Sequence, residues 1–339
     1  MPADCLCYIT QEMKFSVIIP VYNVNSYLRE CLDSLLAQSV VDWEAVCIDD
    51  GSTDGSGMIL DEYADRDSRF LVVHKANGGV SSARNAALKV ASGDWICFLD
   101  ADDVWSPWML ASAQYAVVGC PDADVVRFKN CNFEECAEIE WRRPNFTNVD
   151  VVDMTSNVPY VGNAVCLWML MFRREVISEA IFPNCAYYED MVFVYRAFDK
   201  CNKLLDIDER LYGYRARPGS AMRSDVSEKW LFSLINSPFL ALKVVESSPK
   251  CFTKLAFRQN CNKVTEEFYE SLLRFRCDLA CRRKWRHDWL VILRQILEFR
   301  KVRGFQRYRI WWLVHVPLIP IFYMLCFFPN WLKRKGFHR

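Results

Sequence analysis

The sequence lacks net charge, internal repeats and the cysteine spacing of a metal or disulfide framework. Its 42 Lys and Arg residues equal its 42 Asp and Glu residues in number. Among its 16 cysteines, the closest pairs are Cys5/Cys7 and Cys277/Cys281, and neither is accompanied by a second pair or a histidine partner. Others, such as Cys47, lie in apolar runs, where cysteine behaves as a small hydrophobic residue. We therefore expect reduced thiols in a cytosolic compartment.

The sequence also lacks a signal peptide at its N-terminus. Residues 1–13 contain neither a basic segment nor a long apolar segment, and a strand-like run follows them directly. We expect these residues to form an extension ahead of a cytoplasmic domain. A length of 339 residues with a hydrophobic fraction of 52% is enough for one large core or two smaller ones.

The zero net charge conceals an asymmetry along the chain. Residues 251–339 contain 19 Lys and Arg against 6 Asp and Glu, so the rest of the chain is acidic. A basic end of this kind is typical of contact with an anionic surface, such as a membrane or a nucleic acid. The alternative is a solvated face of one or more helices.

Strand and helix patterns alternate from residue 15 to residue 128. Apolar strand-like runs are followed by stretches with helical spacing, which predicts an α/β fold with a mostly parallel sheet covered on both faces. Such sheets bind ligands at the carboxyl ends of their strands. Four polar, glycine-rich or acidic loops are expected to meet there, at residues 22–23, 49–52, 74–79 and 100–103.

The acidic loop carries Asp100, Asp102 and Asp103 directly after an apolar strand. Carboxylates this close repel one another unless a cation lies among them. Hard oxygen ligands suit Mg²⁺ or Mn²⁺, which in turn bind phosphates. The alternative is a solvated turn whose aspartates cap the next helix.

Two further loops of the same rim carry polar groups. The stretch from Asp49 to Ser56 partly resembles a calcium-binding EF-hand loop, but it follows a strand rather than a helix, so we expect a turn in which Asp49 or Asp50 binds a base or ribose. The stretch Asn77-Gly78-Gly79 opens a helix whose N-terminus favours anions. Arg84, one turn into that helix, is expected to contact a phosphate or one of the rim carboxylates.

Two later segments have both a chemical and a structural explanation. Glu189 and Asp190 precede an amphipathic helix, where a carboxylate either caps the helix or takes a proton from a sugar hydroxyl as a general base. Arg215 and Arg217 alternate by two, so on a strand they share a face. Their guanidinium groups suit phosphate oxygens, and the alternative is an edge strand protected by charge.

Taken together, these motifs resemble glycosyltransferase family 2, whose members have the GT-A fold. The resemblance covers residues 14–222. The segments that carry it, in the order of the family, are Ser16–Asn23, Asp49–Asp54, Asn77–Gly79 with Ala83–Asn85, Phe98–Asp103, Trp168 ahead of Phe172–Arg174, Tyr188–Asp190 and Tyr212–Ser220.

The resemblance implies transfer of a sugar, with inversion, from a nucleotide-diphospho donor that is often UDP-linked. Asp190 corresponds to the catalytic base, with Glu189 beside it. Asp102 corresponds to the direct ligand of Mn²⁺ or Mg²⁺, and Asp100 to a group at the metal or the ribose. The residues implied to bind the nucleotide are Pro20, Tyr22, Asn23, Asp49, Asp50, Asn77, Arg84 and Asp100. Those implied on the diphosphate or acceptor side are Arg215, Arg217, Ser220 and Trp168.

Beyond this domain we expect a basic helical region at 223–309 and an apolar tail at 310–339. The run 310–328 contains two prolines and has basic residues on both sides, so an anchor in the membrane plane fits it better than a simple span. A bilayer span and a core helix or dimer interface are the alternatives. An anchor would place the protein at the inner face of the cytoplasmic membrane, near a sugar or lipid-linked saccharide acceptor.

Two other functions compete with sugar transfer. The first is a nucleotide-sugar-binding protein without turnover, against which Asp102 and Asp190 argue. The second is a nucleic-acid-binding protein, suggested by the basic C-terminal part. No nucleic-acid-reading motif accompanies those charges, so we expect no nucleic-acid partner.

Overall fold

The computed structural model describes residues 13–134, 139–155, 166–184 and 188–217, together with residues 240, 241, 244 and 247. Structural statements below concern these residues. The expected apolar tail, and almost all of the N-terminal extension and the basic region, lie outside them. The domain limits 14–222, 223–309 and 310–339 therefore stay predictions.

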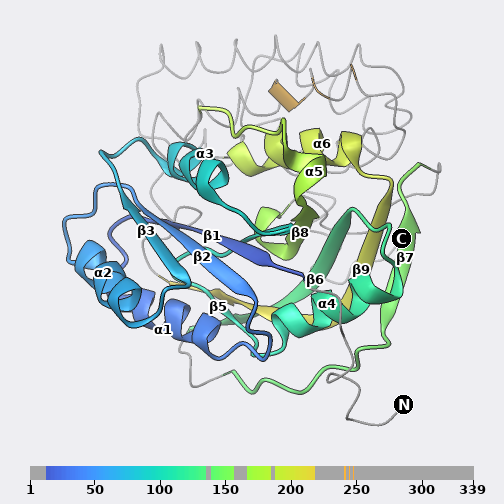
Figure 1. Cartoon of the computed structure of the whole chain (residues 1–339), viewed down its shortest axis with the longest axis horizontal. Coiled ribbons are helices and arrows are strands. Elements are labelled where there is room, and N and C mark those ends of the chain that lie inside the picture. Colours follow the sequence, from blue (N-terminus) through green and yellow to red (C-terminus); the bar gives the residue numbers. More distant parts are fainter. Residues whose placement is uncertain are drawn as a thin grey trace, which may run out of the picture. The chain divides into compact units, whose positions relative to one another are not determined.

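The described residues form one nine-stranded sheet in the order β3-β2-β1-β4-β8-β6-β9-β5, with β7 paired to β9 (Figure 1). Strands β3, β2, β1 and β4 are mutually parallel, whereas β8 runs antiparallel to both of its neighbours. The strand bounds are β1 Phe15–Val21, β2 Trp43–Asp49, β3 Phe70–His74, β4 Trp95–Phe98, β5 Val104–Trp105, β6 Val125–Phe133, β7 Val149–Asp153, β8 Leu170–Arg173 and β9 Lys203–Arg215.

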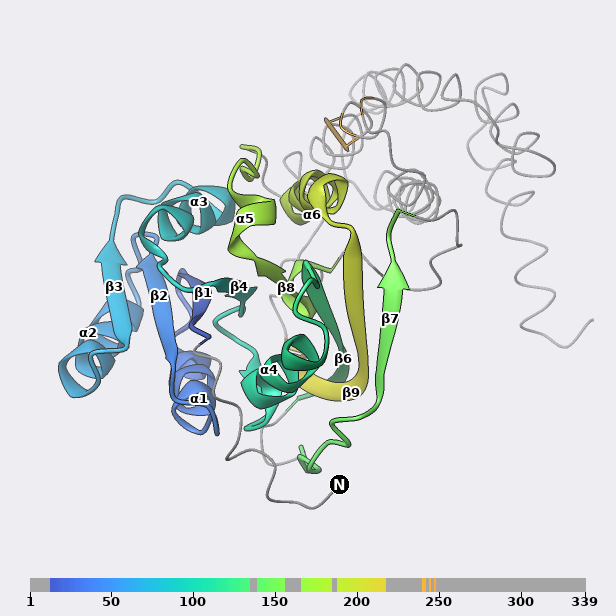
Figure 2. The ribbon, with the colours of Figure 1, turned by 45° about the vertical axis from the view of Figure 1, so that its right-hand side comes forward.

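Helices cover both faces of the sheet (Figures 1 and 2). Helices α1, α2 and α4 lie on one face, and α3, α5 and α6 lie on the other. Their bounds are α1 Asn25–Leu36, α2 Ser56–Arg66, α3 Val80–Val90, α4 Met109–Gly119, α5 Arg174–Ile177 and α6 Glu189–Lys200. This arrangement confirms the predicted α/β class, with a parallel part of the sheet flanked by helices.

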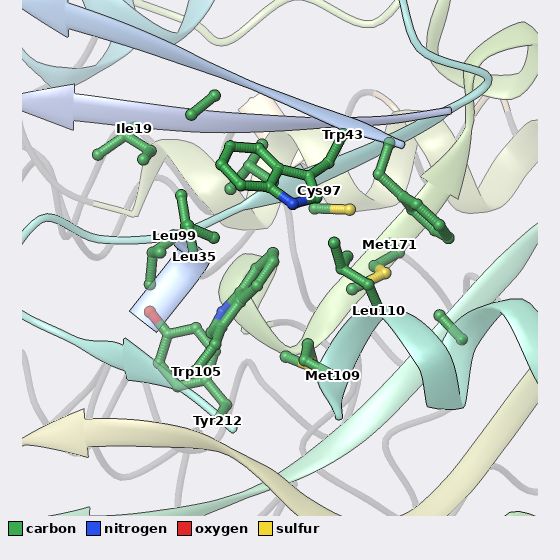
Figure 3. Packing of buried hydrophobic residues seen from close by; sticks show 14 of the residues in the cluster. Ile19, Leu35, Trp43, Cys97, Leu99, Trp105, Met109, Leu110, Met171 and Tyr212 are labelled. Atoms are coloured by element: carbon green, nitrogen blue, oxygen red, sulfur yellow. The ribbon is translucent and has the colours of Figure 1, made fainter. Parts of the chain in front are cut away.

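The core beneath α1, α2 and α4 arises from the two-residue period of the strands. Alternate side chains of β1, from Phe15 to Val21, point to this face and are buried. Around them pack large side chains from the helices on this face and from the other strands, and Figure 3 shows Trp43, Trp105, Met109 and Met171 among them. Because both faces are covered, β1 and β2 consist almost entirely of buried residues.

Two segments differ from what the sequence pattern predicts. The apolar run 165–172 is typical of a single strand, but the structure has a short 3-10 helix, Leu167–Met169, before β8. The apolar runs 204–207 and 211–215 are typical of two short strands, but β9 is continuous. Its polar residues 208–210 lie at a register shift against β6, where the strand bends (Figure 2), so their polarity marks a bulge and not a loop.

Strands β5 and β7 are not predicted from the sequence. Strand β5 has only two residues, too few for a periodic signal, and is defined by pairing with Tyr212 and Gly213. Strand β7 lies at an edge of the sheet and is largely exposed, so its side chains lack the alternation of a half-buried strand.

Candidate active site

The loop after β4 is anchored to the end of β9 by its third aspartate. The hydroxyl of Tyr212 donates to Oδ2 of Asp103 at 2.7 Å, and the backbone N–H of Arg215 donates to Oδ1 at 2.7 Å. Asp103 is only 1% exposed. Burial, with the nearby charges of Asp100 and Asp102, raises the pKa of Asp103 well above its usual range. Asp103 thus fixes the loop, so the sequence-based suggestion of a simple helix cap is incomplete.

Both predicted arginines contact the second aspartate of this loop. Arg217 donates from Nε to Oδ2 of Asp102 at 2.5 Å. Arg215 donates from Nε to the backbone oxygen of Asp102 at 2.8 Å, and its guanidinium is ion-paired with Glu30 and lies over the ring of Phe133. Arg215 is buried, whereas Arg217 is partly exposed. Arg215 therefore holds the loop from its buried side, and Arg217 is the guanidinium on its exposed side.

The first aspartate of the loop is joined to the acidic pair of α6 by one buried arginine. Arg84 donates from Nη2 to Oδ1 of Asp100 at 3.0 Å and from Nη1 to Oε1 of Glu189 at 2.6 Å. Arg84 is 16 positions from Asp100 and 105 positions from Glu189 in the sequence. Of the two predicted roles for Arg84, contact with rim carboxylates is the one present in this structure.

The second residue of the acidic pair, Asp190, has the environment of a proton acceptor near neutral pH. Burial first, and then the negative charge of Glu189, raises the pKa of Asp190 to about 7, although Arg84 acts in the opposite direction. Burial also raises the pKa of Glu189. Tyr188, just before the helix, has a left-handed backbone with φ of 60°. Strained residues of this kind often occur where a side chain is held for function.

On the other side of the rim, Asp50 binds the glycine loop. Its carboxylate accepts hydrogen bonds from the N–H groups of Gly78 at 3.0 Å and Gly79 at 2.7 Å, and it is ion-paired with Lys75. Gly51 has a φ of 77°, and a Cβ there would lie 3.0 Å from the backbone nitrogen of Asn77. The glycine therefore lets the loops after β2 and β3 lie against each other.

Asp49 lies on the α2 side of the same rim. Its Oδ1 accepts from the backbone N–H of Ser52 at 2.9 Å, and its Oδ2 is 2.8 Å from Nδ1 of His74. Burial alone would raise the pKa of Asp49, but the hydrogen bonds from Ser52 and His74 outweigh it and lower its pKa. The two neighbouring aspartates thus have different surroundings, although the sequence assigns both to the nucleotide.

The remaining predicted residues lie around these two groups. The ring of Tyr22 is 51% exposed at the end of β1, and Asn23 has a left-handed backbone and accepts from Thr53 at 2.8 Å. Pro20 is partly buried in β1, and Asn77 is exposed. Trp168 stacks on Tyr214, with ring centroids 5.4 Å apart. Ser220 lies outside the described residues.

Two carboxylates of the loop have the chemistry of a divalent-cation site. Among the described residues, no group of three His, Cys, Asp or Glu side chains is arranged to hold a metal ion. Mg²⁺ and Mn²⁺, however, are commonly held by one or two carboxylates together with substrate phosphates. Asp100 and Asp102 each use only one oxygen in the contacts to Arg84 and Arg217 that the described part of the chain makes. The residues therefore fit a cation that is completed by a diphosphate.

Sequence reasoning missed several residues that build the site. The roles of Tyr212 and Lys75 as partners of Asp103 and Asp50 have no local signal, because the partners are distant in sequence.

No helix among the described residues has the length and apolarity needed to cross a membrane. The run 310–328 lies outside those residues, so the membrane hypothesis stays a prediction.

Comparison with known proteins finds related sequences. Residues 16–179 match the family described as Glycosyl transferase family 2. The chain is 34% identical over 218 residues to the uncharacterized glycosyltransferase EpsJ of Bacillus subtilis (strain 168), covering 60% of this chain and 62% of that protein. It is 31% identical over 236 residues to the glycosyltransferase GlyG of Streptococcus pneumoniae serotype 4 (strain ATCC BAA-334 / TIGR4), covering 65% and 76%. The chain thus spans less than two thirds of EpsJ.

A solved structure supports the fold. Residues 1–349 of S. aureus TarS, crystallised in complex with UDP-GlcNAc, superpose with a TM-score of 0.63 at 22% identity, covering 96% of this chain and 93% of that one. This likeness extends the agreement from the sequence to the arrangement of the strands and helices.

Proposed function

The chain belongs to glycosyl transferase family 2, and from this premise we propose that it transfers a sugar from a nucleotide-diphospho-sugar to a hydroxyl group of a saccharide acceptor, with inversion. One observation carries the proposal. Arg84 joins the carboxylates of Asp100 and Glu189, so the acidic loop and the acidic pair of α6 belong to one cluster. This arrangement supports the proposal that the phosphate-side groups and the proton acceptor act on the same donor.

In the proposed reaction, Asp190 takes the proton of the acceptor hydroxyl as that oxygen bonds to the anomeric carbon of the donor. The bond from this carbon to the diphosphate oxygen breaks, and its electron pair leaves with the nucleoside diphosphate. Attack from the face opposite the leaving group inverts the anomeric centre. A single carboxylate base is sufficient for this displacement, whereas hydrolases of glycosides use a carboxylate pair.

The leaving diphosphate would be held on the loop after β4. We propose that Asp102 and Asp100 hold a Mn²⁺ or Mg²⁺ ion together with the diphosphate, and that Arg217 lies on the exposed side of the same group. The ion would supply positive charge to the departing phosphate oxygens. Asp103, through Tyr212 and Arg215, keeps the loop in place while this charge develops.

We assign the nucleotide to the loops after β1, β2 and β3. The exposed ring of Tyr22 suits stacking against a base, and the Asp50 carboxylate beside the glycine loop suits a base or ribose N–H or O–H group. We propose UDP as the nucleotide, supported by the UDP-GlcNAc complex of the structurally similar TarS. The acceptor would be a growing polysaccharide or a lipid-linked saccharide, for which the basic and apolar sequence of residues 251–339 supports contact with a membrane surface.

Substitution of Asp190 tests this function directly. We expect Asp190→Asn to lower the rate of transfer by about 1,000-fold while leaving donor affinity within about twofold, because it removes the proton acceptor and keeps the shape. Transfer is measured by release of nucleoside diphosphate with a panel of nucleotide sugars, and donor binding by calorimetry. Asp208→Asn, an exposed aspartate in β9, is the matched control. Equal transfer by the wild-type and Asp190→Asn proteins, or donor binding without any transfer in the wild type, would contradict the proposal.

A further inference from the structure

Asn85, the residue after Arg84 in α3, binds the backbone of a distant segment at two points. Its Nδ2 donates to the carbonyl oxygen of Phe182 at 2.9 Å, and its Oδ1 accepts from the N–H of the same residue at 2.9 Å. The side-chain amide therefore pairs with Phe182 as a neighbouring strand would. Ninety-seven positions of the chain separate the two residues, so the contact fixes one part of the fold relative to another.

Phe182 in turn lies between the two elements that carry the acidic residues. Its ring stacks on Phe193 of α6, with centroids 4.0 Å apart and an angle of 4° between the planes. It also meets the ring of Phe98, at the end of β4, edge to face at 5.7 Å. Phe182 is only 2% exposed. It acts as a rigid spacer between α6 and β4, because close-packed aromatic rings have little room to shift.

The spacer is close in sequence to the reacting groups on both sides. Phe193 is three residues after Asp190 in α6, so the two lie about one helical turn apart. Phe98 is two residues before Asp100. Arg196 of α6 also donates to the carbonyl oxygen of Ile181 at 2.6 Å, which ties the neighbouring residue to the same helix. A shift of Phe182 would therefore alter the separation of Asp190 from the acidic loop.

We propose that Asn85 is a positioning residue for sugar transfer, which sets the place of Asp190 relative to the acidic loop by holding Phe182 between α6 and β4. This inference rests on the proposed role of Asp190 as the base. Arg84 and Asn85 are consecutive in α3. Arg84 binds the Glu189 carboxylate directly, whereas Asn85 acts through Phe182 on α6, the helix that carries the acidic pair. The helix that follows the glycine loop thereby sets the geometry of proton transfer.

The test substitutes Asn85 and measures quantities that respond to the position of the base. We expect Asn85→Ala to lower kcat about 10- to 100-fold with donor affinity unchanged within about twofold, because a displacement of about 1 Å is enough to cost this much. The acid limb of the pH–rate profile should move down by about half a unit or more as water reaches Asp190. Asn85→Asp keeps the acceptor for the Phe182 N–H but loses the donor to the Phe182 carbonyl, so its kcat should also be lower than that of the wild type.

A matched asparagine gives the control. Asn148, the residue before the edge strand β7, also donates its side-chain amide to a backbone carbonyl, that of Asp208. Asn148→Ala should leave kcat and the pH profile unchanged. If Asn85→Ala does not fold, the same comparison is made with Asn85→Asp and Phe182→Leu. Wild-type kcat and an unmoved acid limb in the folded variants would overturn the inference.

A double substitution separates this inference from the proposed function. If Asn85 acts through Asp190, Asn85→Ala should change the residual rate of Asp190→Asn by less than about twofold, because the group it positions is already absent. A full 10- to 100-fold further loss would overturn the positioning role while leaving the base intact. Normal activity of Asp190→Asn alone would instead overturn the proposed function.

Discussion

The carboxylates on the two sides of the rim have opposite surroundings. On the nucleotide side, Asp49 and Asp50 are each met by backbone N–H groups and a basic side chain, and the pKa of Asp49 is lowered. On the transfer side, Asp100 and Glu189 share Arg84, Asp190 follows Glu189 in α6, and loss of solvent raises the pKa of each of the three. In the proposed function, the same residue types bind the nucleotide on one side and accept a proton or hold a cation on the other.

This difference lies in what surrounds the charge. A carboxylate that accepts several hydrogen bonds is stable as an anion, so keeping it ionised costs the fold little free energy. Where several carboxylates share one buried guanidinium, their negative charge is only partly neutralised. The transfer side is therefore expected to respond strongly to added or removed charge, and the nucleotide side weakly.

Removal of divalent cations should show the largest effect on the transfer side. We expect EDTA to lower the rate of transfer at least about 100-fold and Mn²⁺ or Mg²⁺ to restore it, since the diphosphate would otherwise approach uncompensated carboxylates. The measurement is initial rate against free metal concentration. A rate that does not depend on EDTA would remove the acidic loop from the mechanism.

Loss of the shared guanidinium should come next. Arg84→Met would leave the buried carboxylate of Glu189 and the partly buried carboxylate of Asp100 without their cation, so we expect a loss of about 3–5 kcal/mol in the free energy of unfolding. Chemical denaturation at pH 7.5 measures it. Arg29→Met, which breaks an exposed pair with Glu62, is the control and should lose much less stability, because an exposed ion pair contributes little. Equal losses in the two variants would show that the transfer side does not depend on Arg84.

A smaller effect is expected on the pH dependence of transfer. Asp190 accepts a proton only when it is ionised, so kcat/KM of the wild type should rise with pH through about 7. Glu189→Gln removes a neighbouring negative charge that raises the pKa of Asp190. The acid limb should then move down by about one unit, as followed by kcat/KM between pH 5 and 9. A limb that stays in place would mean that another group controls the profile.

The smallest effect is expected on the nucleotide side. Contacts with Asp49 and Asp61 raise the pKa of His74 above its usual value. The stabilisation from these contacts is therefore fully present below about pH 6.5 and is lost as the pH rises through the folded-state pKa. His74→Gln should cost less than about 1 kcal/mol at pH 6, because the imidazole is half-exposed, and still less at pH 9. Thermal unfolding at the two pH values measures this cost. A larger cost at pH 9 would show that the stabilisation does not come from a protonated imidazole.

Sequence reasoning predicts the features that leave a local pattern in the chain. Up to residue 90, the sequence pattern predicts each strand and helix within two residues of its observed bounds, because these elements are apolar runs and helical faces separated by polar turns. The predicted strands are 15–21, 43–48 and 70–73, and the predicted helices are 26–38, 56–66 and 80–90. The acidic loop and the acidic pair are found because several unusual residues stand together. Their mutual placement could be expected only from the family resemblance, since nothing local connects Arg84 with Glu189.

The rest depends on contacts that leave no pattern in the chain. Asp103 is indistinguishable from its neighbours in the sequence, yet it is the aspartate of the loop that Tyr212 and the backbone of Arg215 hold. Asn85 looks like any polar residue of an amphipathic helix, although both ends of its amide bind Phe182. Pairing across about a hundred positions is set by topology, and neither periodicity nor composition records it.

The anchoring of Asp103 by Tyr212 also has a consequence for biosynthesis. The two residues are 109 positions apart, and β9 is the last strand of the sheet among the residues that the structure describes. A domain generally folds as a unit, so the loop that carries Asp100 and Asp102 gains this anchor only after the ribosome has synthesised β9. A nascent chain that ended before Tyr212 would lack the hydroxyl that holds Asp103.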